Sequence, residues 1–274
     1  MSLETTIASL VAAANALTNE VSGKIADINK KVLAATDAVP ALVRALSTQN
    51  YYIDAVDGDD ANAGTLAKPL KTAAAASAKA VSGSVVTLAF KARQNHTVNF
   101  YLASGRFVIT SYGHTDIKDP NDRPTLRAAL GNVDDLGYQT MAGPAVSSGQ
   151  MYMTGVNLIC DVDTNLPLAT NSSFIRYLNS HMSIMMYWCD ITLGNIPFAA
   201  MYTGYSARDI FLASVNIKAK AGYEASAKML LNRNQTNPAV RFEAHAVSLS
   251  GITGGWAQLM PAKSGDNYLT NLAL

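Results

Sequence analysis

The chain has 274 residues, and its 21 Lys and Arg nearly balance 20 Asp and Glu, giving a net charge of +1. This balance argues against a nucleic-acid-binding protein, which would carry a basic field, and a hydrophobic content of 49% argues against a disordered chain. Only 15% of the residues are charged, so Ser, Thr, Asn, Gln and Gly must cover much of the surface.

The amino terminus and the cysteines indicate no targeting or redox function. No basic and apolar leader follows Met1, so we expect no signal peptide. The most apolar stretch, residues 182–202, is interrupted by Asp190, Asn195 and Pro197, and we expect no membrane span. Cys160 and Cys189 are predicted to be small buried side chains without a disulfide, metal or cofactor.

The first 49 residues are predicted to form an α-helical coiled coil. Apolar residues recur at alternating steps of four and three, with one extra step of four between Val21 and Ile25 that constitutes a stutter. The predicted trimer seam consists of Leu3, Ile7, Leu10, Leu17, Val21, Ile25, Ile28, Val32 and Val39. We expect Pro40 to kink or end the helix near Val39 because it lacks an amide donor.

A narrow apolar stripe on one helix cannot bury itself. Either the helix packs on the rest of its own chain, or several copies associate, and the narrowness of the seam favours association. The mixture of Ile, Leu and Ala at seam positions does not by itself determine the number of helices.

Residues 50–83 are predicted to contain a short strand at 51–56, a turn-rich loop at 57–64 and a helix at 73–81 with Thr72 as its N-cap. The acidic loop raises the alternative of a calcium site. The EF-hand pattern fails because Asn62 and Lys68 stand at its sixth and twelfth positions. A solvated turn and an irregular calcium site remain as alternatives.

The run YYIDAVDGDDANAGTLAKPLKTAAAASAKAV resembles the opening segment of right-handed parallel β-helix proteins. That group includes bacteriophage tailspikes and tail fibres, and also secreted pectate-lyase-like enzymes. Together with the preceding coiled coil, the resemblance favours the phage proteins. It implies a homotrimer in the virion, made in the host cytoplasm and joined through the N-terminal helix to another phage tail or baseplate protein.

Residues 84–274 are predicted to form the body of this β-helix. Strand-like runs occur at 85–90, 97–102 and 106–110, and a turn-rich excursion is expected near 111–145. Four similar short strands recur at 155–159, 189–193, 214–218 and 246–250. Residues 268–274 could cap the last coil or join a neighbouring chain. A β-sandwich or barrel is the alternative fold.

The predicted fold class is therefore mainly β, a right-handed parallel β-helix preceded by an N-terminal coiled coil, in a homotrimer. The domains are residues 1–49 for the coiled coil, 50–83 for the opening strand, loop and capping helix, and 84–274 for the body. Together with this architecture, the resemblance implies a trimeric tail fibre or small tailspike that contributes to attachment at the host surface.

No catalytic residues are predicted. After residue 50 the only glutamates are Glu224 and Glu243, and no pair of acids shares a recognisable position in the repeats. The four histidines are scattered at His96, His114, His181 and His245. Aromatic residues that could stack on a host glycan, or equally belong to the core or a subunit interface, are Tyr152, Tyr187, Trp188, Tyr202, Tyr205 and Trp256.

Two enzymes remain as alternatives. One is a polysaccharide-degrading tailspike, a glycoside hydrolase or lyase whose carboxylates meet between subunits. The other is a cellular pectate-lyase-like enzyme, for which a monomer with calcium-dependent activity would be expected.

Overall fold

A computed structural model describes residues 2–170, 172–176, 182–201, 208–232, 239–260 and 267–272. The chain divides into two compact units, Met1–Ser47 and Thr48–Leu274. Each unit is described by itself below.

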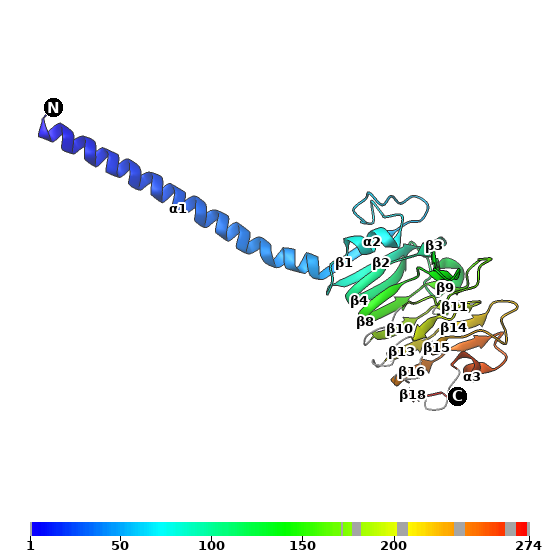
Figure 1. Cartoon of the computed structure of the whole chain (residues 1–274). Coiled ribbons are helices and arrows are strands. Elements are labelled where there is room, and N and C mark those ends of the chain that lie inside the picture. Colours follow the sequence, from blue (N-terminus) through cyan, green and yellow to red (C-terminus); the bar gives the residue numbers. More distant parts are fainter. Residues whose placement is uncertain are drawn as a thin grey trace. The chain divides into compact units, whose positions relative to one another are not determined.

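The first unit is one helix, α1 (Leu3–Ser47), drawn in blue in Figure 1. Ser2 precedes it, and the Ser2 hydroxyl accepts a hydrogen bond from the amide of Thr5. The helix does not end near Val39, because its backbone stays helical through Pro40 to Ser47. The φ angle of proline suits a helix, and the following Ala-Leu-Val-Arg-Ala-Leu run consists largely of good helix formers, which offsets the lost hydrogen bond.

The second unit contains a long parallel sheet of eight strands among the described residues, in the order β1-β2-β4-β8-β10-β13-β16-β18. The strands of this long sheet are β1 (Thr48–Ile53), β2 (Val85–Lys91), β4 (Tyr101–Tyr112), β8 (Ala145–Thr154), β10 (Met182–Tyr187), β13 (Arg208–Ala213), β16 (Ala239–His245) and β18 (Asn267–Thr270).

A short parallel sheet has six strands within the described ranges. They are β3 (Asn95–Val98), β5 (Thr125–Ala128), β9 (Asn157–Cys160), β11 (Asp190–Leu193), β14 (Asn216–Ala219) and β17 (Ser248–Ser250). The four recurring strands of the sequence correspond to β9, β11, β14 and β17. They lie side by side in this sheet, with Asp190 in register with both Asn157 and Asn216. Their predicted similarity is therefore confirmed as a structural repeat.

A third set of parallel backbone pairings is separate from those within the long and short sheets. It contains the parallel pair β12 (Ala199–Met201) and β15 (Leu230–Asn232), and isolated parallel bridges join Ala145 to Arg176 and Ile175 to Ala199. From β8 onward the chain runs from the long sheet to the short sheet, through this third set of pairings, and back to the next strand of the long sheet (Figure 1). The second unit is thus mainly β with long parallel sheets, an arrangement compatible with a parallel β-solenoid.

The stretch near 111–145 is not wholly an excursion. Its β5 pairs with β3 and β9 inside the short sheet. The parts outside the main sheets are the short 3-10 helix η1 (Pro120–Asp122) and the antiparallel hairpin of β6 (Leu130–Val133) and β7 (Gln139–Met141). This stretch forms several short elements rather than one long strand, because Pro and Gly are frequent between its apolar runs.

The described part of the second unit also contains two short α-helices. In α2 (Ala73–Lys79), Thr72 is the N-cap as predicted, and its hydroxyl accepts a hydrogen bond from the amide of Ala75. The other is α3 (Gly255–Leu259). Among the helices that the structure describes, none has the length and apolarity that a membrane crossing requires.

The core lies between the sheets, where strand residues alternate between inward and outward positions. Its large inward side chains include Phe90, Phe107 and Phe242. Cys160 and Cys189 are both buried and free, and burial raises the pKa of each thiol. Both cysteines therefore belong to the core.

Candidate functional site

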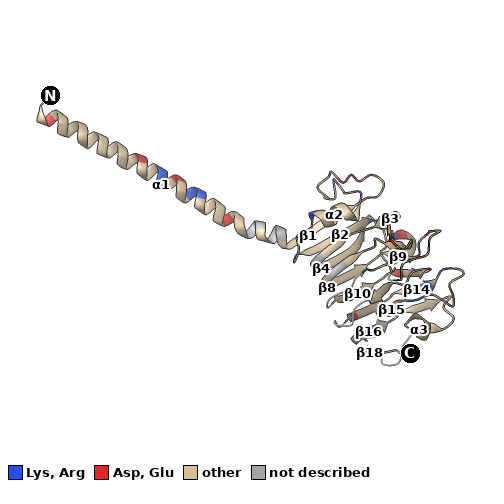
Figure 2. Ribbon diagram, viewed as in Figure 1, with Lys and Arg blue, Asp and Glu red and all other residues tan. Residues whose placement is uncertain are grey.

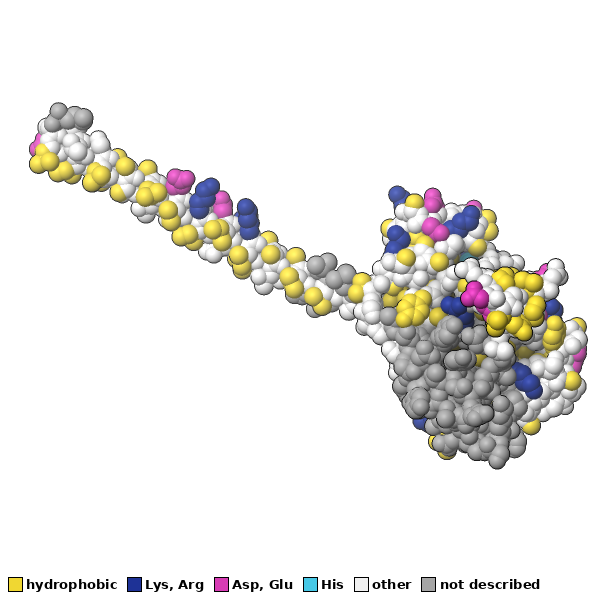
Figure 3. Space-filling view, in the orientation of Figure 1, with side chains coloured by type: hydrophobic (Ala, Val, Ile, Leu, Met, Phe, Trp, Pro, Cys, Tyr) yellow, Lys and Arg dark blue, Asp and Glu magenta, His cyan; other side chains and the backbone are white. Residues whose placement is uncertain are grey.

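The apolar seam of α1 is exposed along its whole described length. All nine predicted seam residues are exposed, and Leu10 keeps 71% of its surface accessible. Figure 3 shows hydrophobic side chains along the lower edge of α1, with the charged side chains of its middle part on the opposite edge. Figure 2 shows how few charges the helix carries. Val11 and Leu33, next to seam positions, are also exposed and widen the stripe.

The outer face of the long sheet carries a ladder of rings from four adjacent strands. The ring centroids of Tyr152 and Tyr187 are 5.5 Å apart, those of Tyr187 and Phe211 are 5.7 Å apart, and those of Phe211 and His245 are 5.3 Å apart. Their chain neighbours Met153, Met186 and Leu212 point inward and are fully buried. The alternation of strand side chains therefore places this aromatic ladder on the outside.

A cavity of about 190 Å³ lies beside the ladder. Its lining comprises Ser183, Met185, Asp209, Ile210, Phe211, Arg241 and Glu243. The Arg241 Nε donates to Glu243 Oε1 at 2.8 Å, and this guanidinium lowers the pKa of Glu243. Asp209 is in register with Arg241 and is thus a diagonal neighbour of Glu243 on the same face. The fold brings two acids together that the sequence did not pair.

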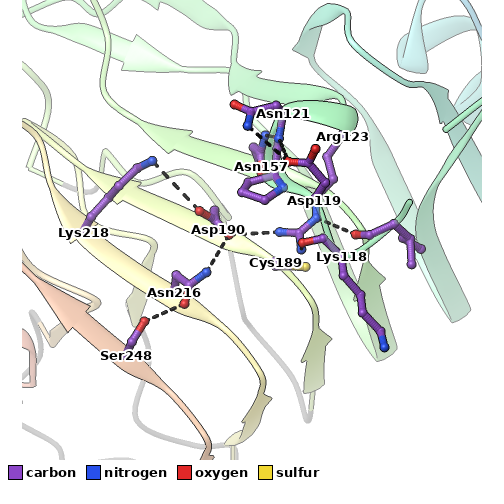
Figure 4. A network of polar contacts seen from close by, with 12 residues as sticks. Lys118, Asp119, Asn121, Arg123, Asn157, Cys189, Asp190, Asn216, Lys218 and Ser248 are labelled. Atoms are coloured by element: carbon purple, nitrogen blue, oxygen red, sulfur yellow. Dashed lines mark hydrogen bonds and ion pairs between the residues drawn. The ribbon is translucent and has the colours of Figure 1, made fainter. Parts of the chain in front are cut away.

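A polar network runs along the corner at which the short sheet begins (Figure 4). The first residues of β11, β14 and β17 are Asp190, Asn216 and Ser248. Asn216 Nδ2 donates to Asp190 Oδ1 at 3.0 Å, and the Ser248 hydroxyl donates to Asn216 Oδ1 at 2.5 Å. Arg123, only 5% exposed, donates to Asp190 Oδ1 at 2.9 Å. Asp190 is therefore held by a buried ion pair.

Arg123 also holds the loop between β4 and β5. It donates to the carbonyl oxygens of Ile117 and Lys118 at 2.7 and 2.6 Å. Asn157, at the start of β9, donates through Nδ2 to the carbonyl of Pro120 at 2.7 Å. The network therefore fixes this loop over the corner.

Near β1, a second polar cluster surrounds Asp54. Burial raises the pKa of this carboxyl, but hydrogen bonds from Lys91, Gln94 and two backbone amides outweigh burial and hold it well below its ordinary value. His96 lies beside the cluster, and its Nε2 is 3.1 Å from the carbonyl oxygen of Lys91. Because a carbonyl only accepts, Nε2 carries the proton, and burial lowers the pKa of His96.

The predicted glycan-stacking residues do not form one cluster. Tyr187 belongs to the aromatic ladder, whereas Trp188 stands at the corner that follows β10. Trp256 packs edge-on against the buried Phe242, with ring centroids 5.6 Å apart. Tyr202 and Tyr205 lie outside the described residues, as does His181.

Sequence reasoning named Tyr152 and Tyr187 as possible stacking residues but missed Phe211 and His245 as their neighbours. The alternation of apolar residues within each strand could have placed their side chains outward. Only the register between strands, however, brings them into one line.

Three further acids, Asp161, Glu224 and Asp60, have local partners. Asp161 binds Lys220 Nζ at 2.5 Å, and Glu224 accepts from the amide of Gly222. In the acidic loop, Asp60 accepts hydrogen bonds from the amides of Lys71 and Thr72. No group of three or more His, Cys, Asp or Glu suited to a metal ion occurs within the described ranges.

No protein-family model, curated protein or solved structure matches the chain.

Proposed function

We propose that this chain is a trimeric phage tail fibre or small tailspike that contributes to attachment at the host surface. In this proposal α1 forms a three-stranded coiled coil, and the second unit is a right-handed parallel β-helix. The helix also joins the trimer to another tail or baseplate protein of the virion.

The exposed seam of α1 is the observation that carries the proposal. Soluble monomers rarely leave a long contiguous apolar surface in water, and the heptad spacing suits burial against parallel copies of the same helix. The choice of three copies comes from the resemblance of residues 51–81 to the opening segment of phage β-helix proteins.

The outer face of the long sheet is the proposed glycan-contacting surface. Aromatic rings offer apolar faces on which sugar rings can stack, and the polar rim of the adjacent cavity can hydrogen-bond sugar hydroxyls. Tyr187 and Phe211 are the central rings of this surface.

Light scattering on the full chain tests the association. We expect three times the chain mass of 29.0 kDa. The double variant Leu17→Asp/Ile28→Asp places carboxylates in the seam and should give monomers, since burying unpaired charges is unfavourable. The control Asn19→Asp adds a carboxylate to the opposite side of the helix and should leave the trimer intact. A monomeric wild-type chain would contradict the proposal.

A polysaccharide-degrading tailspike is the second candidate. One observation favours it, because Asp209 and Glu243 line the same cavity and glycosidases use two carboxylates, one as acid and one as base or nucleophile. The lowered pKa of Glu243 suits the base or nucleophile. Release of reducing ends from host polysaccharide, abolished by Asp209→Asn and by Glu243→Gln, would establish it. Absence of release by the wild-type chain would contradict it.

A further inference from the structure

The corners between the long and short sheets share one unusual backbone conformation. Two residues before each short-sheet strand β9, β11, β14 and β17, the chain adopts a positive φ angle. The residues at these positions are Gly155 at 64°, Trp188 at 48°, Ser214 at 53° and Ala246 at 50°. The next residue points inward, and Val156, Cys189 and Val215 are fully buried. These corner positions are therefore structurally equivalent.

Trp188 is the only large residue among these four. The large Arg93, two residues before β3, also has a positive φ angle of 60°, but its side chain forms an ion pair with Asp122. The left-handed conformation disfavours any residue with a Cβ, and glycine at Gly155 avoids that cost. Unlike Arg93, the Trp188 side chain forms no hydrogen bond within the described residues that would explain a bulky residue in this conformation, and such a residue points to a function rather than to folding.

The ring of Trp188 is available for contact. It keeps 38% of its surface exposed, because its neighbour Cys189 takes the inward position. The indole N–H donates no hydrogen bond to any residue in the described part of the chain. Trp188 thus presents an aromatic surface together with a free donor.

Lys118 supplies a positive charge beside this ring. Its Nζ lies 5.9 Å from the centroid of the indole. Lys118 is exposed, and within the described ranges its ammonium forms no ion pair. The backbone of Lys118 is fixed because its carbonyl accepts a hydrogen bond from the buried Arg123 (Figure 4). The Lys118 side chain therefore extends from a loop whose backbone is already held in place before any ligand binds.

We propose that Trp188 and Lys118 form a binding site for an acidic saccharide, in which the sugar ring stacks on the indole and its carboxylate faces the Lys118 ammonium. This inference rests on the proposed attachment function and names its ligand class. A nucleic acid is disfavoured because the chain has a net charge of +1 and lacks a basic field.

The test measures binding of the full chain to a panel of uronate- and sialate-containing oligosaccharides, with neutral oligosaccharides of matched length. Wild-type protein should prefer the acidic members. Trp188→Gly should weaken this binding about tenfold, whereas Trp188→Phe, which keeps a stacking ring, should lose much less. Lys118→Met should weaken acidic binding about fivefold and leave neutral binding unchanged.

Ser214→Gly is the matched control, because Ser214 stands at the equivalent corner before β14, the strand that pairs directly with β11 in the short sheet. It should not affect saccharide binding. Lys118→Met changes an exposed side chain and keeps the inference testable if Trp188→Gly does not fold.

Unchanged acidic binding in both Trp188→Gly and Lys118→Met would overturn the inference, and so would a wild-type chain that binds no acidic member of the panel. Light scattering on the same samples separates this result from the proposed function. A trimeric mass with binding that does not depend on Trp188 contradicts only the saccharide site, whereas a monomeric mass contradicts the tail-fibre proposal.

Discussion

Both units contain large apolar side chains, but the second unit buries many of them whereas the first leaves them exposed. In the second unit, strands distant in sequence pack together and bury side chains such as Phe90, Ile109 and Leu158. In α1 the seam residues, such as Leu17 and Ile28, remain exposed. A local sequence pattern is sufficient to form a helix, but an apolar face is buried only when another surface packs against it. The strands of the second unit find that surface on other strands of the same chain, whereas the seam of α1 does not.

The largest expected difference between the two units is in how their thermal stability responds to dilution of the protein. Because isolated helices are marginal in water and association follows mass action, the melting temperature of the α1 helical signal should fall as the protein is diluted. The melting of the β signal should not change. Circular dichroism over a wide range of protein concentration measures both. An α1 transition independent of concentration would break the comparison.

A large loss of stability in the second unit is expected from Arg123→Met. Asp190 would then lose its buried partner and keep only the half-exposed Lys218 ammonium, 4.0 Å away, as a cationic neighbour. Removal of one member of a buried ion pair typically lowers the free energy of unfolding by about 3–5 kcal/mol. Urea unfolding of the β unit measures the loss. The control is Arg241→Met, since the Arg241 side chain in the Arg241–Glu243 pair is 60% exposed and surface pairs contribute little. Equal losses in the two variants would contradict the structural role of Arg123.

A smaller loss, about 2 kcal/mol, is expected from Gly155→Ala. The added Cβ would lie 2.3 Å from Ile117 Cγ1, in a backbone conformation that favours glycine. At the equivalent corner, Ala246→Gly should instead raise stability by about 0.5 kcal/mol, because relief of the left-handed strain exceeds the added entropy of the unfolded chain. Urea unfolding of both variants checks the opposite signs.

The smallest effect concerns the pH dependence of His96. Burial lowers its pKa in the folded chain, below the unfolded value of about 6.5, so the unfolded state binds the proton first as pH falls. Stability should therefore decrease as pH drops through about 6.5, and the loss should level off below the folded pKa.

His96→Gln removes this titration while keeping an amide that can donate to the carbonyl of Lys91. The difference in melting temperature between pH 7 and pH 5 should be smaller in this variant than in the wild-type chain. The nearby Asp54 does not contribute to this difference. Because its pKa is lowered in the folded chain, its contribution to stability is lost only as the pH falls below the unfolded carboxyl pKa of about 3.9. Identical pH profiles would contradict the role of His96.

Much of the fold could be predicted because its signals are local. Thr72 followed by an Ala-rich run indicated the N-cap of α2, and the recurrence around Val156, Ile191, Ile217 and Leu249 indicated neighbouring strands. The division of residues 97–102 between β3 and β4 was missed, since both halves are strand-like and only the turn between them separates two sheets.

The candidate site was less predictable. The ladder of Tyr152, Tyr187, Phe211 and His245 requires the register of four strands, and the pairing of Asp209 with Glu243 requires two strands to be adjacent. Neither relation has a signal in local spacing. The cation beside Trp188 comes from a loop far away in sequence.

By itself, the sequence determined the helical seam, the N-cap of α2 and the repeated strands of the short sheet, because each depends on residues within a few positions of one another. Only the tertiary structure decided which aromatic rings meet, that Arg123 is buried against Asp190, and that Trp188 occupies a corner beside Lys118. These features arise from the pairing of parallel strands that are distant in sequence, which brings together residues that local periodicity cannot relate.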